Sequence, residues 1–475
     1  MSVRVRFAPS PTGYLHIGGA RTCLYNYLFA KKMGGKLILR IEDTDLDRSK
    51  KEFEESQIND LKWFGMDYDE GPGKEGSFGP YRQSERLDIY KKHAAELIES
   101  GKAFYCFCSD DELEQMREKA HAEGRDPLYE GPWRDFPLDK AKEKIKNGER
   151  PVIRFKVPKK DIEFTDLVRG KVNFPHGMVG DFVILRSNGM PTYNFCCVVD
   201  DALMNISHVI RGEDHLNNTL RQLMVYEACG FDIPEFAHVS LLVGEDRQKL
   251  SKRHGATSVT QYKDQGYLAE ALGNYLCLLG WSHPDEKDIF KLDEIKDIFE
   301  INRFSKSSAL YDIKKLNWVN GQHFRSMDAE DLLQFIEAQK DVSFFGDESS
   351  EWKREFVSLH VEKVQTINEF RTFYDNIYSS TLDVGESENE VLSWETTPTI
   401  KEFVQTEILK SNEHFMSSVE VSNWMEALKK EHKIKGKNLF MGLRVVLTGC
   451  CHGPDLKRLL PLTTRQIIIE RLASI

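Results

Sequence analysis

The chain opens with alternating apolar and polar positions that predict a strand, a loop and a helix. Residues 3–7 alternate apolar side chains with two arginines, which is the period of a strand. Residues 9–13 are rich in proline and end in glycine, so they predict a turn-rich loop. Apolar positions over 20–28 then recur at helical spacing, and the glycines at 34–35 end that helix. An apolar run at 37–39 predicts a buried second strand, and this order is typical of a parallel sheet with right-handed crossovers.

The pattern becomes mixed after the first hundred residues. Residues 102–185 combine short strands with a charged helix at 110–123, which indicates a segment inserted between two halves of the sheet. Candidates for further parallel strands lie at 182–185, 207–211 and 237–243. Ligands of such sheets bind beyond the carboxyl ends of the strands, where the loop at 8–19 and an acidic cluster at 42–45 are expected to lie.

Amphipathic helices replace strands in the last third of the chain. We therefore predict an α/β protein with an inserted α+β subdomain, followed by an all-α domain. The predicted parts are residues 1–101 and 186–245 as the two halves of the sheet domain, 102–185 as the insertion, 246–324 as a helical region, and 325–475 as the helical domain.

Composition narrows the class of protein. The 475 residues carry a formal net charge of -11, which argues against a basic protein that coats nucleic acid but allows a local basic groove. No run approaches the roughly 20 apolar residues of a membrane span, and residues 1–6 lack the apolar core of a signal peptide. Nine cysteines are too sparse for a disulfide scaffold, so we expect a reducing compartment, the cytoplasm.

The string Pro9–Gly19 has the properties of a phosphate-binding segment. Glycines let a nucleotide approach the backbone closely, and the helix that begins at Gly18 and Gly19 offers free N–H groups and a positive dipole end to an anion. His16, just before it, is placed to donate to a phosphoryl oxygen. The alternative for His16–Gly19 alone is an ordinary glycine turn with a hydrogen-bonded histidine, but the preceding residues make the whole string far more specific.

A second string, Lys249-Leu250-Ser251-Lys252-Arg253, places three cations within five residues. A run of this kind is often a solvated loop. Here it follows a strand and a Gly-Glu-Asp turn, in a region that returns to the sheet edge. There the ammonium groups of Lys249 and Lys252 could stabilise a triphosphate as charge moves onto pyrophosphate.

Together the two strings resemble the signature motifs of class I aminoacyl-tRNA synthetases, and residues 6–22 are similar to the bacterial-type glutamyl-tRNA synthetase family. Further matches occur in family order at 40–45, 191–194, 199–201, 209–214 and 249–253. The resemblance implies a Rossmann-type catalytic domain, an acceptor-stem-binding insertion, a stem-contact region and a helical anticodon-binding domain. It also implies ATP with Mg²⁺, L-glutamate and tRNA(Glu) as substrates, formation of glutamyl-adenylate that requires bound tRNA, and a monomer.

Glutamate has two carboxylates and one ammonium, so a selective site needs two cationic groups and an anion, and arginine suits carboxylates because it binds them through two parallel hydrogen bonds. The resemblance implies Arg6 for the side-chain carboxylate, Arg211 for the α-carboxylate, and Glu42 with Ser10 for the amino group, with Tyr193 lining the pocket. The alternative for the arginines is that they lie on the surface, in ion pairs at the sheet edge. The implied ATP contacts are Pro9, Thr12, His16, Gly18, Gly19, Asp214, Leu250, Ser251, Lys252 and Arg253.

No covalent intermediate with the enzyme is needed, because the substrate carboxylate attacks the α-phosphorus and the tRNA hydroxyl then attacks the adenylate. Catalysis is therefore positioning and charge stabilisation, which we assign to His16, Lys249 and Lys252.

Some positions depart from the family pattern or leave its details open. Cys106 and Cys108 form half of a zinc site, but Trp133 and Asp135 stand where relatives have a second ligand pair, so we expect no structural zinc. Cys197 stands where some relatives have Asn, and the role of His215 is open. Charging of tRNA(Gln) is also open. Alternative functions are a short tRNA-modifying relative, a glutaminyl enzyme, a small-molecule nucleotidylyltransferase and a non-catalytic RNA-binding paralogue.

Overall fold

The structure, a computed structural model, describes residues 2–74, 76–251, 257–339 and 344–475. The chain divides into two compact units, one formed by Met1–Lys263 and Ala269–Ile313 and the other by Asp264–Leu268 and Lys314–Ile475. The sequence analysis divides the chain into five parts, more than these two units, and the boundaries of those five parts stay predictions. In the described part of the chain, each helix is too short or too polar to cross a membrane.

The first unit contains the parallel strands that the sequence predicts near its beginning. Strand β1 (Arg4–Phe7) pairs in parallel with β2 (Lys36–Leu39). On its other side β1 lies beside β8 (His208–Gly212), because the Ser207 N–H donates to the Arg4 carbonyl at 2.9 Å. Strand β8 in turn pairs in parallel with β9 (Glu235–Val239), and all four strands are largely buried.

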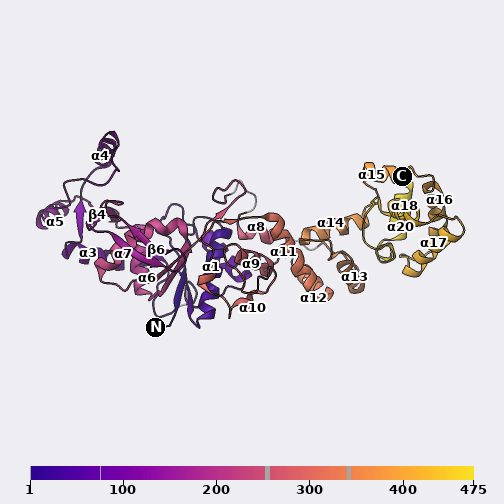
Figure 1. Cartoon of the computed structure of the whole chain (residues 1–475), viewed down its shortest axis with the longest axis horizontal. Helices are drawn as coiled ribbons and strands as arrows, with labels where there is room; N and C mark the ends of the chain where they lie inside the picture. The colour runs from indigo at the N-terminus through magenta and orange to yellow at the C-terminus, as the bar shows by residue number, and fades with distance from the viewer. Residues whose placement is uncertain (1, 75, 252–256, 340–343) are drawn as a thin grey trace. The chain divides into compact units, whose positions relative to one another are not determined.

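Helix α1 (Ile17–Lys32) is capped by His16, the residue before it, and packs against β1 and α9 (Ala269–Leu278; Figure 1). The His16 ring accepts the Gly18 N–H, which satisfies one of the free donors of the first turn. The helix ends at Met33, and Gly34 adopts a positive φ of 59°. A Cβ atom at Gly35 would lie 2.3 Å from the Val3 carbonyl oxygen, so a glycine is required where the chain turns back along β1.

Residues 102–185 form a three-stranded sheet and a hairpin, and one prediction made for them is wrong. Strands β3 (Ala103–Cys106), β4 (Val152–Phe155) and β7 (Phe182–Leu185) make an antiparallel sheet, whereas the sequence pattern predicted 182–185 as a returning parallel strand. A short apolar run fixes neither the direction nor the partner of a strand.

A hairpin of the same segment extends the main sheet. Strand β5 (Ile162–Asp166) pairs with β6 (Gly170–Phe174) in antiparallel fashion and with β9 in parallel, through Asp166 and Phe236. The inserted segment is therefore joined to the sheet through hydrogen-bonded backbone as well as through its two ends. A short parallel pair, β10 (Leu242–Val243) with β11 (Ala309–Leu310), completes the strands of the described residues.

The first unit also contains the helices that precede β11 in the chain (Figure 1). Besides α1 and α9 they are α2 (Lys51–Trp63), α3 (Leu87–Glu99), α4 (Asp110–Ala122), α5 (Leu138–Lys146), α6 (Tyr193–Leu203), α7 (Leu216–Cys229), α8 (Val259–Asp264) and α10 (Leu292–Ile295).

The second unit is helical in its described residues, as the sequence predicts. One aromatic cluster forms around Trp352, Phe356 and Phe370, and a second core contains Val404 and Trp424. The helices are α11 (Ile313–Ser326), α12 (Ala329–Ala338), α13 (Ser350–His360), α14 (Ile367–Tyr378), α15 (Glu386–Leu392), α16 (Thr397–Ile408), α17 (Ser418–Lys430), α18 (Gly436–Thr448), α19 (Leu456–Leu459) and α20 (Arg465–Ser474).

An ion pair beneath β1 makes stability depend on pH. Arg4 and Glu70 form two parallel hydrogen bonds of 2.8 and 2.9 Å, and these, with Lys36 and Tyr81, lower the pKa of Glu70 to about 2. Since the folded pKa lies below the ordinary value of 4.5, the pair stabilises the fold above pH 4.5 and loses this effect as pH falls toward 2. We expect Glu70→Gln to be less stable than the original chain near neutral pH, and the difference to shrink in acid. Urea unfolding of both proteins across this pH range measures it, and a constant difference would contradict the assignment.

Candidate active site

The C-terminal ends of β1 and β8 and the first turn of α1 surround one cavity of about 720 Å³. Most of the residues that the sequence assigns to substrates line it. They are Arg6, Ser10, His16, Gly18, Gly19, Glu42, Tyr193, Arg211, Asp214, Lys249 and Leu250. Among the described residues, Pro9, Thr12 and Ser251 are not part of the cavity wall, and Lys252 and Arg253 lie outside the described residues.

His16 presents a single N–H group to the cavity. Its Nδ1 accepts the Gly18 N–H at 3.0 Å, so the proton of the neutral ring sits on Nε2. Burial, with a contribution from Lys249, lowers the pKa of His16 below 6.5, which keeps the ring neutral at pH 7. The first turn of α1 thus offers an imidazole donor beside the backbone of Gly19, whereas the N–H groups of Ile17, Gly18 and Ala20 already have acceptors.

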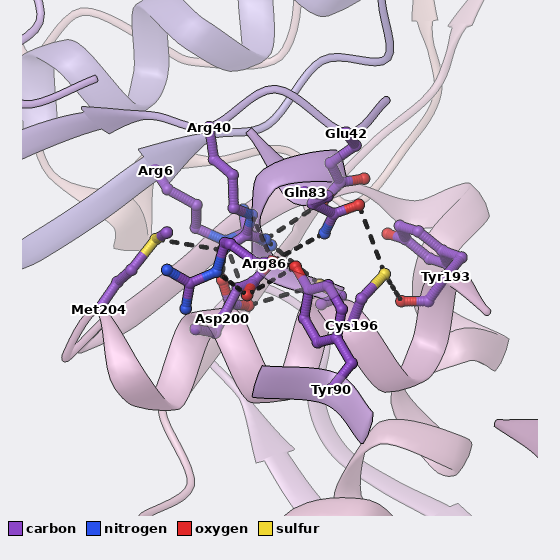
Figure 2. A network of polar contacts seen from close by, with 12 residues as sticks. Arg6, Arg40, Glu42, Gln83, Arg86, Tyr90, Tyr193, Cys196, Asp200 and Met204 are labelled. Carbon is purple, nitrogen blue, oxygen red and sulfur yellow. Dashed lines mark hydrogen bonds and ion pairs between the residues drawn. The ribbon is translucent and has the colours of Figure 1, made fainter. Parts of the chain in front are cut away.

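Arg6 belongs to a buried ion-pair network at the floor of the cavity (Figure 2). Its Nε donates to Asp201 at 3.2 Å, and Asp201 also accepts from Arg40 Nη1 at 2.6 Å. Arg40 Nη2 donates to Glu42 at 3.1 Å, so one guanidinium connects the carboxylate that holds Arg6 to the carboxylate that lines the cavity. Arg6 therefore lies at the cavity as expected, and its ion pair is buried, unlike the surface pair of the alternative interpretation.

The charges of this network respond to burial and to one another. Burial would raise the pKa of Asp201, but Arg40 and Arg6 hold it below its usual value, so this carboxylate is ionised. Burial raises the pKa of Glu42 above 4.5, although Arg40 and Arg6 oppose the rise. Glu42 is consequently the carboxylate whose ionised form gains most from an additional cation in the cavity.

A second layer holds Arg40 from behind. Asp200 lies 3.8 Å from Arg40 Nε and accepts hydrogen bonds from Arg86, Gln83 and Tyr90 at 2.7 to 3.0 Å (Figure 2). The network thus balances three arginines, Arg6, Arg40 and Arg86, against three carboxylates, Glu42, Asp200 and Asp201, all of them buried.

Arg211, in contrast, has neutral partners. Its Nε donates to His238 Nε2 at 3.2 Å, and its Nη2 donates to Thr219 at 2.8 Å and to Gln222 at 2.7 Å. Its Nη1 is buried and finds no hydrogen-bond partner among the described residues. A buried cationic donor without an acceptor is costly, so this atom marks a place for an anionic ligand.

Lys249 and Asp214 stand together at the edge of the cavity. Lys249 Nζ donates to Asp214 Oδ2 at 2.6 Å, and the adjoining Leu250 is buried. Burial would raise the pKa of Asp214, but Lys249 lowers it. The buried Leu250 anchors this end of the second signature string, and Lys249 already has a carboxylate partner.

Pro9 and Thr12 shape the loop rather than the cavity wall. The Pro9 carbonyl accepts the Glu42 N–H at 3.0 Å, and the Thr12 N–H donates to the Ser10 carbonyl at 2.9 Å. These backbone bonds place Glu42 and Ser10, the two residues assigned to the amino group of glutamate.

The sequence alone assigns no role to several residues of the site. Arg40, Asp200 and Asp201 fall in matched strings, yet only the folded chain reveals the ion pairs between them. Arg21, Thr22 and Asn218 also line the cavity. His215, whose role was open, lines it as well, with Nδ1 3.1 Å from the Tyr193 hydroxyl. Burial and Arg211 lower the pKa of His215 to about 4, so it is neutral at working pH.

Cys197 lies just behind the cavity rather than in its wall, as far as the described residues show. Its sulfur is 3.6 Å from both Asp201 and Arg40, and burial raises the pKa of the thiol to about 12. Its neutral thiol therefore packs against the network that holds Arg6.

Cys106 and Cys108 share one partner, the Tyr129 hydroxyl, at 3.4 and 3.7 Å. Trp133 packs against Phe107, and Asp135 pairs with Lys156 at 2.7 Å. Among the described residues no third histidine, cysteine or carboxylate joins the two thiols.

We therefore expect protein purified without added metal to lack stoichiometric zinc, because zinc requires about four ligands. Elemental analysis measures this, with Cys229→Ser as a matched control. Stoichiometric zinc that is lost in Cys106→Ser and kept in Cys229→Ser would overturn the expectation.

Comparison with known proteins gives the family. Residues 2–318 match the model of the class I tRNA synthetases (E and Q) catalytic domain, and residues 329–475 match an anticodon binding domain. The chain is 46% identical to glutamate–tRNA ligase 1 of Caldicellulosiruptor saccharolyticus, over 99% of this chain and 98% of that one. It is 43% identical to glutamate–tRNA ligase of Bacillus subtilis, over 100% and 99%.

A solved structure agrees over the whole length. The crystal structure of a glutamate tRNA ligase from Elizabethkingia meningosepticum, in complex with its amino acid, superposes with a TM-score of 0.89 at 33% identity, over 100% of this chain and 99% of that one. The fold predicted from the sequence, a class I catalytic domain followed by a helical anticodon-binding domain, is thereby confirmed. The chain belongs to the glutamate–tRNA ligase family of class I tRNA synthetases.

Proposed function

We propose that this chain ligates L-glutamate to the terminal ribose of tRNA(Glu) in an ATP-dependent reaction with two steps. Glutamate first attacks the α-phosphorus of ATP, which forms glutamyl-adenylate and releases pyrophosphate. A ribose hydroxyl of the tRNA then attacks the adenylate and releases AMP. The observation that carries the proposal is the pairing, in one cavity, of two buried arginines and a buried carboxylate with the N-terminus of α1.

The charged groups of glutamate match those of the cavity floor. Arg211 Nη1, which has no hydrogen-bond partner among the described residues, would bind the α-carboxylate, and Arg6 would bind the side-chain carboxylate. Glu42, whose pKa is raised by burial, would bind the ammonium together with Ser10. The Tyr193 hydroxyl, held by His215, would line the pocket between them.

ATP would bind at the N-terminus of α1, with Mg²⁺ entering as part of the nucleotide. His16 Nε2, which the bond from Gly18 to Nδ1 leaves as the donor, would donate to a phosphoryl oxygen beside the backbone at Gly19. Lys249 would exchange Asp214 for the triphosphate as charge moves onto pyrophosphate. The assignments of Lys252 and Arg253 rest on the sequence string alone.

The helical second unit would bind tRNA, since residues 329–475 match an anticodon binding domain. We further propose that the chain acts as a monomer in the cytoplasm, a reducing compartment in which its nine cysteines, all described and all unpaired, would stay free. Whether tRNA(Gln) is charged besides tRNA(Glu) is the remaining question of specificity.

Two measurements test the proposal. Exchange of labelled pyrophosphate into ATP should require glutamate and tRNA, and charging of purified tRNA(Glu) and tRNA(Gln), measured side by side, should show which of them accepts glutamate. Exchange with glutamate but no charging of either tRNA would point to the short tRNA-modifying alternative, and exchange that does not depend on glutamate would point to the small-molecule nucleotidylyltransferase. Absence of both would overturn the assignment of the pocket.

A further inference from the structure

Arg211 owes its orientation to groups outside the cavity. Its guanidinium is held at two of its three nitrogens, by His238 at Nε and by Thr219 and Gln222 at Nη2. These bonds fix the plane of the guanidinium and leave Nη1 for a ligand. An arginine held in this way loses little freedom when it binds a carboxylate, so its orientation contributes to affinity.

His238 Nε2 can accept a hydrogen bond from Arg211 only if the proton of the ring is on Nδ1. Nδ1 lies 2.6 Å from Asp166 Oδ2, and both side chains are completely buried. Asp166 also accepts the backbone N–H groups of Val168, Arg169 and His238, so its carboxylate is surrounded by donors and stays ionised. The proton of the imidazole is therefore on Nδ1, and Nε2 presents a lone pair to the Arg211 Nε–H.

The other tautomer of His238 would replace this hydrogen bond with a contact between two donors. A proton on Nε2 would face the Arg211 Nε–H at the observed 3.2 Å, donor against donor. Asp166 is the last residue of β5, in the hairpin that residues 102–185 contribute to the sheet, whereas His238 lies on β9 and Arg211 on β8. The inserted segment thus reaches the cavity through three adjacent strands.

We propose that Asp166 and His238 are positioning residues for glutamate binding: Asp166 holds the proton of His238 on Nδ1, and His238 Nε2 then aims Arg211 at the α-carboxylate. The proposal rests on the proposed function, because it takes Arg211 as the group that binds this carboxylate. Neither residue lines the cavity, so both act through Arg211.

Asp166→Asn is the direct test, since it keeps the size of the side chain but places an amide against Nδ1. We expect the KM for glutamate to rise roughly tenfold or more, the effect of one lost hydrogen bond to a charged group, while the KM for ATP stays within about twofold. A structural defect alone would impair both substrates together. His208→Gln, a half-buried position at the start of β8, is the matched control and should change neither KM.

Two substitutions of His238 distinguish the loss of its hydrogen-bond acceptor from the loss of its side-chain volume. A glutamine amide reaches the place of Nε2 and can accept from Arg211, whereas an asparagine amide reaches only the place of Nδ1. We expect His238→Gln to keep most of the affinity for glutamate and His238→Asn to lose it. The double variant Asp166→Asn with His238→Gln should bind glutamate as well as His238→Gln alone, because glutamine has no ring form to be fixed.

The tautomer of His238 can be measured in the original protein, without any destabilising variant. Nitrogen-15 NMR of histidine-labelled enzyme, with His238→Gln used to assign the signal, should show a proton on Nδ1 and none on Nε2. A proton on Nε2, an unchanged KM for glutamate in a folded Asp166→Asn, or equal rises in both KM values would each overturn the proposal. If the original enzyme fails to charge tRNA with glutamate, the proposed function is wrong instead, and the NMR result still reports on the contact.

Discussion

Arg6→Ala is expected to lower kcat/KM for glutamate by roughly 10²- to 10⁴-fold. The substitution removes a buried cation that neutralises Asp201 and that we assign to the side-chain carboxylate of the substrate. Removing one partner of a buried, hydrogen-bonded charge pair between protein and ligand costs about 2–5 kcal/mol, and about 1.4 kcal/mol corresponds to a factor of ten. Initial rates of charging at varied glutamate concentration, with ATP and tRNA saturating, measure the loss.

Arg4→Lys is the matched control. Arg4 is also buried on β1 and paired with a carboxylate, but it does not line the cavity. This variant should lose stability in urea and keep its KM for glutamate. Near-normal use of glutamate by a folded Arg6→Ala protein would show that Arg6 serves only the ion-pair network.

His16→Asn is expected to slow adenylate formation by about 10²- to 10³-fold and to leave the stability of the fold almost unchanged. Asparagine is a good residue at a helix start, so it should still accept the Gly18 N–H, yet it has no donor in the place of Nε2. The magnitude is that of removing one donor from a site where charge develops in the transition state. Single-turnover formation of the adenylate, measured with tRNA present, gives the rate.

His16→Ala separates the two roles of this residue. It should match His16→Asn in rate but also lose about 1 kcal/mol of stability, because the first turn of α1 then lacks its side-chain acceptor. A His16→Asn enzyme that forms adenylate at the normal rate would remove His16 from the catalytic residues.

The fold was predictable wherever a local pattern determines it. Strand and helix periods anticipate β1, α1 and β2, and the helical last third follows from amphipathic spacing alone. The direction of β7 was not predictable, because its antiparallel pairing with β4 depends on a partner some thirty residues away that a short apolar run does not specify.

The residues of the site also fall into those that the sequence predicted and those that it did not. Residues that belong to dense motifs, such as His16 and Arg211, were found from sequence, and the structure brings them to one cavity. Their supports were not found, because Arg40 with Asp201 and His238 with Asp166 are contacts between residues far apart in the chain. Such pairs consist of ordinary charged residues whose burial is visible only after folding.

The balance of charge beneath the cavity has a consequence for fidelity. The three arginines and three carboxylates of the network neutralise one another, and the ionised Asp166 lies behind Arg211 through His238, so the cavity floor selects by where its N–H donors point and not by an excess of charge. Glutamate would bring a second carboxylate to the donors of the cavity floor, whereas glutamine has the same size but carries an amide in its place. Its amide N–H₂ group would also oppose the donors of Arg6. Rejection of glutamine would therefore need neither a steric barrier nor a second, corrective reaction, because placing its amide in the cavity is itself electrostatically unfavourable.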